Sequence, residues 1–175
     1  TQVLEKSLNT GVIFVLRRMP QGVWREYVDN FGFAEKTGIT LAGEAKGDIK
    51  NLKSGVEIDW LTSSFGQGIS VTPLAITTAI ATLANGGELL KPYIVERIVS
   101  ADENPALEKD KFNLSSDDLS QGRGKEIKRR VIKKTTSEAI TQMLVGVIGN
   151  GSGRLAKIPG YSVAGKTGTA QVSGP

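Results

Sequence analysis

The segment from Tyr161 to Ala170 constrains the fold most, because its residues alternate in character. One alternate series reads tyrosine, valine, glycine, threonine, threonine, and the other reads serine, alanine, lysine, glycine, alanine. Because successive side chains of a β-strand point to opposite faces, the pattern predicts a strand. Its glycines allow another chain to approach the backbone closely, while Lys166 and Thr167 offer a cation and a hydroxyl group to an anion. The segment is therefore predicted to be a strand suited to binding an anionic group.

Composition removes several kinds of catalytic chemistry. The chain has no histidine and no cysteine among its 175 residues, which excludes a Ser-His-Asp triad, a cysteine nucleophile, a disulfide and most zinc sites. The absence of cysteine suits an exported, oxidising location. No cofactor and no metal are expected. With 39% hydrophobic residues, a chain of this length is predicted to form one domain with a core of its own.

Charge and hydropathy favour neither nucleic acid binding nor a membrane span within the chain. The net charge is +4, and the basic cluster from Lys125 to Lys134 has no interleaved aromatic residues. The cluster is therefore predicted to be a solvated strand or loop. No run of about 18 apolar residues occurs. We expect any membrane anchor to precede Thr1 in a longer protein.

Helices are predicted for the first 30 residues and again after Thr72. The first helical region is expected to be interrupted at Ser7-Leu8-Asn9 and at Met19-Pro20, and to end near Gly32. Thr72 and Pro73 predict the N-cap and the first position of a later helix. The expected buried stripe of that helix is Ile76, Ile80 and Leu83.

The second half of the chain is predicted to contain a strand, an insertion and a last helix. Tyr93 to Val99 alternate well enough for a strand, and the polar stretch from Ser100 to Arg123 is expected to be a mobile insertion. Thr135 and Glu138 form a capping-box pattern at the start of the last helix. Its expected apolar face is Ile140, Met143, Leu144 and Val147. The glycines and scattered charges from Thr37 to Gly55 predict a loop-rich crossing.

Two short motifs near opposite ends of the chain point to serine-lysine acyl transfer. Lys166-Thr167-Gly168 is a K-T-G triplet, and Ser7-Leu8-Asn9 is an S-x-N triplet. In penicillin-binding proteins and class A β-lactamases such triplets accompany a nucleophilic S-x-x-K. Each triplet alone also fits an ordinary exposed strand or a turn. No serine of this chain has a lysine three residues later, so we expect the nucleophile to lie upstream of Thr1.

Longer strings over most of the chain resemble the transpeptidase domain of class B penicillin-binding proteins. The strings are Ser64 to Leu74, Ala84 to Gly87, Lys91-Pro92, Gly151 to Gly153, Ile158 to Tyr161 and Val163 to Gln171. The resemblance implies the α+β fold of the penicillin-recognising serine transpeptidases and β-lactamases, in which helices flank a five-stranded antiparallel sheet. Residues 1–175 would form a partial transpeptidase domain that runs from the S-x-N triplet to the K-T-G strand. The S-x-x-K segment and the C-terminal strands would lie outside the chain.

The same resemblance implies a peptidoglycan D,D-transpeptidase that cross-links cell-wall stem peptides through a serine acyl-enzyme and binds penicillin. The implied catalytic residues are Ser7, Asn9, Lys166 and Thr169, and the implied substrate-binding residues are Thr167, Gly168 and Thr169. Ser7 would relay a proton, and Asn9 would hold the catalytic lysine and the substrate amide. Lys166 would fix the Ser7 hydroxyl group. Thr167 and Thr169 would bind the substrate's terminal carboxylate, and the Thr169 N–H would form half of the oxyanion hole.

The implied partners are stem peptides, β-lactams and other cell-wall synthesis or division proteins. The protein would be anchored in the cell membrane, with this domain on the extracytoplasmic side. Two alternatives stay open. One is a β-lactam sensor or β-lactamase of the same superfamily, and the other is a non-catalytic scaffold that binds cell-wall assembly proteins. An S-x-x-K upstream of Ser7 would favour the enzyme over the scaffold.

Overall fold

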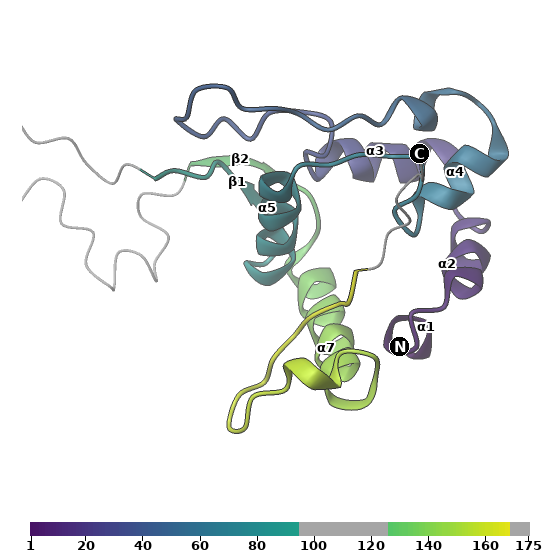
Figure 1. The fold of residues 1–175 in the computed structure, drawn as a ribbon, viewed down its shortest axis with the longest axis vertical. Helices are drawn as coiled ribbons and strands as arrows, with labels where there is room; N and C mark the ends of the chain where they lie inside the picture. Colours follow the sequence, from purple (N-terminus) through teal and green to yellow (C-terminus); the bar gives the residue numbers. More distant parts are fainter. Residues whose placement is uncertain (95–125, 169–175) are drawn as a thin grey trace, which may run out of the picture.

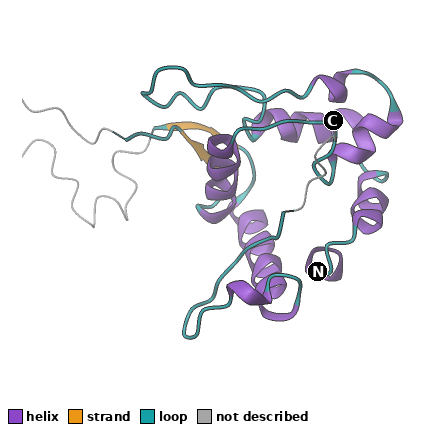
Figure 2. Cartoon of the chain, in the orientation of Figure 1, coloured by secondary structure: helices purple, strands orange, loops and turns teal. Residues whose placement is uncertain are grey.

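The computed structural model describes residues 1–94 and 126–168, and there helices predominate beside a short pair of strands (Figures 1 and 2). In chain order the elements are α1 (Gln2–Glu5), α2 (Asn9–Leu16), α3 (Gln21–Asn30), η1 (Lys50–Lys53), α4 (Glu57–Ser63), α5 (Pro73–Ala84), β1 (Glu88–Leu90), β2 (Ile127–Arg130), α7 (Lys134–Asn150) and η2 (Arg154–Ala156). The insertion predicted from Ser100 to Arg123 lies outside the described residues.

The breaks predicted in the N-terminal helices are confirmed. α1 ends at Glu5 and α2 begins at Asn9, so the S-x-N triplet spans the turn between them. α3 ends at Asn30, and Gly32 follows with a φ of +82°. Glycine enters this left-handed region without the steric cost that a side chain brings, so the glycine stops the helix at the predicted place.

The predicted start of α5 is confirmed, but its predicted buried stripe is wrong. Thr72 Oγ1 accepts a hydrogen bond from Ala75 N at 3.1 Å, and Pro73 occupies the first helical position. The large side chains of Ile76 and Ile80 are 45% and 52% exposed. The buried positions carry small residues instead: Ala75, Ala79 and Thr82. α5 packs against both α7 and β1, and small side chains allow neighbouring backbones to approach closely.

The last helix begins earlier than its capping-box pattern predicts. α7 starts at Lys134 with Lys133 at the N-cap, and no side chain caps it. Thr135 and Glu138 are both exposed within the helix. Ser137 is buried and donates a hydrogen bond to Leu83 O at the end of α5. The start of α7 is therefore fixed by its contact with α5 rather than by a capping box.

The expected apolar face of α7 is partly right. Val147 is fully buried at 0% exposure, whereas Met143 is 37% exposed. Ile140 and Leu144 are half-buried. The face that packs against the rest of the chain therefore also takes in Ser137 and Ile148, which are both buried.

The strands differ from those that the sequence predicts. β1 and β2 pair antiparallel, with Glu88 opposite Arg130 and an irregularity between Leu89 and Leu90. The predicted strand from Tyr93 to Val99 is wrong at its start, because Tyr93 and Ile94 are not in a strand, and its remainder lies outside the described residues. The basic cluster supplies β2, so a strand is confirmed there, but Lys128 and Arg129 are half-buried and paired with Glu35 rather than solvated. No strand is assigned to residues 161–168, since the described part of the chain provides no neighbouring strand for them.

The core of the N-terminal half lies among α3, η1 and α4. Val28, Ile49 and Leu52 form its buried centre. The half-buried residues packed against them are Trp24, Phe33, Ala34, Trp60 and Ile69. Trp24 Nε1 donates to Ser63 Oγ at 2.9 Å, which satisfies the indole donor inside this core.

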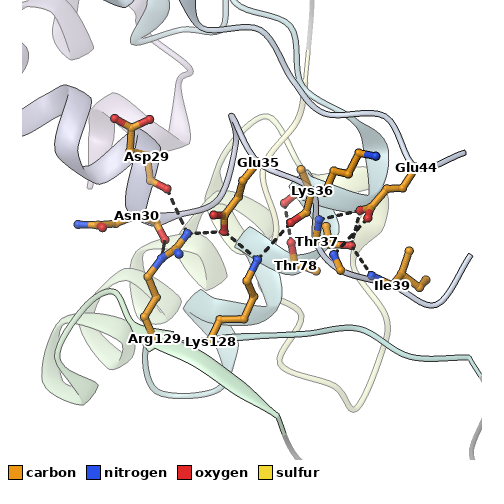
Figure 3. A network of polar contacts seen from close by, with 12 residues as sticks. Asp29, Asn30, Glu35, Lys36, Thr37, Ile39, Glu44, Thr78, Lys128 and Arg129 are labelled. Carbon is orange, nitrogen blue, oxygen red and sulfur yellow. Dashed lines mark hydrogen bonds and ion pairs between the residues drawn. The ribbon is translucent and has the colours of Figure 1, made fainter.

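Glu35 joins the strand pair to the end of α3 (Figure 3). Its Oε1 accepts hydrogen bonds from Lys128 Nζ at 2.9 Å and from Arg129 Nη2 at 2.6 Å. Arg129 also donates to the carbonyl groups of Asn30 and Asp29 at 2.8 and 3.2 Å, where a cation complements the helix dipole. Burial acts to raise the pKa of Glu35, but the hydrogen bonds and charges of Arg129 and Lys128 outweigh it and hold this pKa below its ordinary value. We call Glu35, Lys128 and Arg129 the Glu35 clamp.

Candidate active site

Ser7 lies in the turn between α1 and α2 in an unusual backbone conformation. Its φ is +51°, and no other non-glycine residue in the described part of the chain has a positive φ. Two backbone hydrogen bonds close the turn, from Ser7 N to Leu4 O at 3.2 Å and from Leu8 N to Val3 O at 3.0 Å. A residue held in the left-handed region costs about 1–2 kcal/mol, and such strain gathers at functional sites. This turn places the Ser7 side chain beside the K-T-G triplet.

Lys166 connects the two triplets directly. Its ammonium group donates to Ser7 Oγ at 2.8 Å, across 159 positions of sequence. It also donates to Thr167 O at 3.0 Å and to Thr167 Oγ1 at 3.2 Å. An ammonium group has three donors and no acceptor, so these three contacts use its full capacity. The structure therefore brings together the serine and the lysine that the motifs predict.

α7 holds both triplets in place. α1 and the segment that leads to Lys166 both lie along this helix (Figure 1). Gly165 N donates to Leu144 O at 3.3 Å, which ties the K-T-G segment to the middle of α7. On the other side, a Cβ added at Gly151, just after the helix, would lie 2.5 Å from Glu5 O and 2.8 Å from Glu5 Cα. The glycine at that position lets the backbone at the end of α1 approach the end of α7 closely.

The turn after α7 contacts the end of α1 and the K-T-G triplet. Ser152 N donates to Glu5 O at 2.9 Å, and Ser152 Oγ lies 3.2 Å from Thr167 Oγ1. The sequence motifs did not predict that Ser152 or Glu5 lies at the site. The available signal was the string from Gly151 to Gly153, which contributed to the resemblance without indicating a role.

The site carries the positive charge of Lys166, which forms no ion pair with another described residue. Lys166 and Thr167 are both exposed. Within residues 1–94 and 126–168, no carboxylate oxygen lies within 4.0 Å of the Lys166 ammonium nitrogen, the distance that would make an ion pair. An anion that reached this surface would therefore meet one cation and one hydroxyl group. Over the same residues, no group of three acidic, histidine or cysteine side chains is placed to hold a metal ion.

The other predicted site residues are less constrained by the structure. Asn9 is the first residue of α2 and is exposed, and its side chain makes no hydrogen bond to another described residue. Gly168 is exposed, with nothing within 4 Å of an added Cβ. Thr169 lies outside the described residues. Of the predicted residues, Ser7, Lys166 and Thr167 are thus joined by hydrogen bonds, whereas the Asn9 side chain makes none to them.

Comparison with known proteins adds a family to this geometry. A family model described as the penicillin-binding protein transpeptidase domain matches residues 1–175. Stage V sporulation protein D of Bacillus subtilis (strain 168) is 34% identical over 170 residues, which cover 97% of this chain and 24% of that protein. Penicillin-binding protein PbpB of Mycobacterium tuberculosis is 30% identical over 182 residues, which cover 100% of this chain and 25% of that protein. The chain thus spans about a quarter of the length of these relatives.

Solved structures show the same similarity. Penicillin-binding protein 3 from Mycobacterium tuberculosis in complex with aztreonam matches with a TM-score of 0.80 and 27% identity, over 99% of this chain and 37% of that one. The transpeptidase domain of penicillin-binding protein 3 from Burkholderia pseudomallei matches with a TM-score of 0.77 and 26% identity, over 98% of this chain and 45% of that one. These matches confirm the predicted fold class, of which the chain holds a part.

Proposed function

Since the chain belongs to the penicillin-binding protein transpeptidase family, we propose that it forms part of a peptidoglycan D,D-transpeptidase that also reacts with β-lactams. The enzyme would join stem peptides through a serine acyl-enzyme. The observation that carries the proposal is the 2.8 Å hydrogen bond from Lys166 Nζ to Ser7 Oγ. It supports a shared proton-transfer role for two residues that lie at opposite ends of the sequence.

The nucleophile would be the serine of an S-x-x-K segment, which these 175 residues do not contain. Its oxygen would attack the carbonyl carbon of the D-Ala-D-Ala bond and release the last alanine, and an amine of a neighbouring strand would then take the acyl group. The chain has no imidazole, so a lysine held neutral would accept the serine proton. The lysine of the S-x-x-K segment suits this role.

Ser7 would pass that proton on toward the leaving nitrogen. Lys166 donates to Ser7 Oγ, so the serine oxygen already accepts a charged hydrogen bond and its own hydrogen is free to be donated. A cation on the oxygen also stabilises the negative charge that develops there as the proton leaves. Asn9, two residues further on, would hold the catalytic lysine and the substrate amide.

The K-T-G segment would bind the far end of the substrate. The exposed charge of Lys166 would attract the terminal carboxylate, and Thr167 and Thr169 would donate hydrogen bonds to it. Gly168 would leave room for the bound peptide. The N–H group of Thr169 and that of the nucleophile would together form the oxyanion hole. The exposure of Lys166, Thr167 and Gly168 supports this assignment.

We further propose that the enzyme is anchored in the cell membrane with this domain on the extracytoplasmic side, where peptidoglycan is cross-linked. Other cell-wall synthesis or division proteins would be its partners there. Among the described helices, none is long and apolar enough to cross a bilayer.

Labelling with a fluorescent penicillin tests the proposal. The full-length protein that carries this chain should form a covalent adduct, and peptide mapping should place it on the serine of an S-x-x-K segment. A variant with that serine changed to alanine is the control and should not be labelled. Failure of the full-length protein to label would favour the non-catalytic scaffold. Labelling followed by rapid hydrolysis of the adduct would favour a β-lactamase.

A further inference from the structure

Ser152, in the turn after α7, contacts Glu5 at the end of α1 and Thr167 of the K-T-G triplet, but it has no part in the mechanism above. We propose that Ser152 is a positioning residue: its hydroxyl group donates to Thr167 Oγ1, so that Thr167 can give its own hydrogen to the substrate's carboxylate. This inference rests on the proposed function, because it takes that carboxylate as the ligand of Thr167.

The argument starts from the hydrogen-bonding capacity of Thr167. A threonine hydroxyl group has one hydrogen and two acceptor lone pairs. Lys166 Nζ donates to Thr167 Oγ1 at 3.2 Å and so occupies one lone pair. Ser152 Oγ lies 3.2 Å from the same oxygen, at a distance where either hydroxyl group can donate. If Thr167 donated to Ser152, its single hydrogen would be used and a carboxylate would meet only lone pairs.

A bound carboxylate settles the direction of this bond. An ionised carboxylate only accepts hydrogen bonds, so Thr167 has to turn its hydrogen toward it. Ser152 then donates to the second lone pair of Thr167. With one hydrogen bond accepted from a cation and another from Ser152, the Thr167 hydroxyl group is polarised, and the bond that it donates becomes stronger. Ser152 acts on the substrate through Thr167 and does not touch it.

The backbone holds Ser152 in position independently of its side chain. Ser152 N donates to Glu5 O at 2.9 Å. The glycines on either side have no room for a side chain: a Cβ at Gly151 would lie 2.5 Å from Glu5 O, and one at Gly153 would lie 2.6 Å from Ile148 Cδ1. Since neither restraint involves the hydroxyl group, Ser152→Ala removes the hydroxyl group and leaves the turn in place.

The experiment compares two acylating agents that differ in one group. For the full-length protein, the second-order acylation rate is measured with a penicillin and with its methyl ester, which lacks the charged carboxylate. Ser152→Ala should lower the rate with the penicillin by about 3- to 10-fold, the range of one hydrogen bond, and should leave the rate with the ester within about 2-fold of wild type. Ser152→Thr, which keeps a hydroxyl group, should restore the penicillin rate. Ser162→Ala, in the exposed segment before Lys166, is the matched control and should change neither rate.

Equal losses with the two agents, or no loss with either, would overturn the inference, because the hydroxyl group would then have no specific effect on the carboxylate. If Ser152→Ala folds poorly, Ser152→Cys is judged by the same comparison, since its thiol is only a weak donor. Failure of the proposed function is separate and visible in the same assay. In that case the wild-type protein would not be acylated, or Lys166→Ala would be acylated as fast as wild type.

Discussion

The hydrogen bond between Lys166 and Ser7 depends on the backbone conformation of Ser7 and on the contact of Gly165 with α7. Ser7 has a left-handed conformation in the α1–α2 turn, with φ at +51°. The hydrogen bond from Gly165 N to Leu144 O sets the height of the neighbouring Lys166 along α7. The resulting 2.8 Å contact leaves Lys166 as donor and Ser7 as acceptor. Ser7 can therefore donate its own hydrogen to a group outside the pair, as a proton relay requires.

Thr167→Val tests whether the Thr167 hydroxyl group binds the substrate's carboxylate. The substitution keeps the shape and removes one hydrogen bond to a charged group, which is worth about 1.5 to 3 kcal/mol. In the full-length protein, the second-order acylation rate with a penicillin should fall by about 10- to 150-fold, and the loss should shrink with the methyl ester. Thr167→Ser, which keeps the hydroxyl group, serves as control. An undiminished loss with the ester would show that the role assigned to Thr167 is wrong.

The motifs in the sequence named Ser7, Lys166 and Thr167, and the structure brings these residues together. Motif spacing could not predict the distance between them, because 159 positions separate Ser7 from Lys166 and they meet only through the packing of α1 and of Gly165 against α7. Ser152 escaped prediction for a related reason. A serine between two glycines in sequence indicates only a turn, and its contacts with Glu5 and Thr167 arise from the tertiary fold.

Among the helices and strands, apolar spacing and turn chemistry predicted where several elements begin and end, but not which face they bury. Thr72 caps α5 as expected, because an N-cap is a local interaction. The buried face of α5 is offset by one position from the predicted one, and it carries the small residues Ala75, Ala79 and Thr82. α4 was not predicted at all; it has seven residues and packs against η1 and α2. Alternation predicted a strand from Tyr161 to Ala170, but residues 161–168 form none, because a strand also needs a partner.

The Glu35 clamp predicts a pH dependence of stability. Because Lys128 and Arg129 hold the pKa of Glu35 below its ordinary value of 4.5, Glu35 stabilises the fold fully above that pH, and this contribution is lost as the pH falls through the lower folded pKa. Glu35→Gln should therefore lower the free energy of unfolding by about 1 kcal/mol at neutral pH, a value that allows for solvent screening of a partly exposed pair. Below the folded pKa the difference from wild type should vanish.

Thermal unfolding of the full-length protein and its variants across this pH range provides the measurement. Glu26→Gln on α3 is the matched control, because Glu26 is exposed and forms no ion pair with another described residue. It should change the unfolding temperature little at any pH. A Glu35→Gln effect that stays constant from neutral to acidic pH would contradict the role of the clamp.

In the molecule as a whole, several large apolar side chains lie exposed on the helices. Ile76 and Ile80 on α5 are 45% and 52% exposed, and Phe14 and Val15 on α2 are 58% and 55% exposed. The chain aligns with 37% of the solved penicillin-binding protein 3 from Mycobacterium tuberculosis. Large exposed apolar patches on a folded protein usually mark places where another part of the protein or another molecule binds.

The isolated 175-residue chain should therefore self-associate and bind a hydrophobic dye. Analytical ultracentrifugation over a range of concentrations measures the association. Replacing Ile76 and Ile80 together by serine should weaken it, whereas Thr77→Ser, on the same helix, should not. A monodisperse monomer that unfolds cooperatively and binds no dye would contradict this expectation.

The isolated chain should also fail to form a stable adduct with a β-lactam, because none of its serines belongs to an S-x-x-K segment. Intact-protein mass spectrometry after incubation with penicillin measures this directly, with the full-length protein as the positive control. A penicilloyl adduct on any of the 175 residues would show that the assignment of the nucleophile is wrong.

The central claim is that Lys166 and Ser7 act as one proton-relay unit, and a double-mutant cycle on the acylation rate of the full-length protein tests it most directly. Lys166→Ala and Ser7→Ala should each slow acylation by a β-lactam by about 10²- to 10⁴-fold, the usual range for positioned acid-base and electrostatic catalysis. Because each residue acts through the other, the double variant should be about as slow as the slower single variant. Losses that multiply in the double variant would contradict the claim, since the two residues would then act independently.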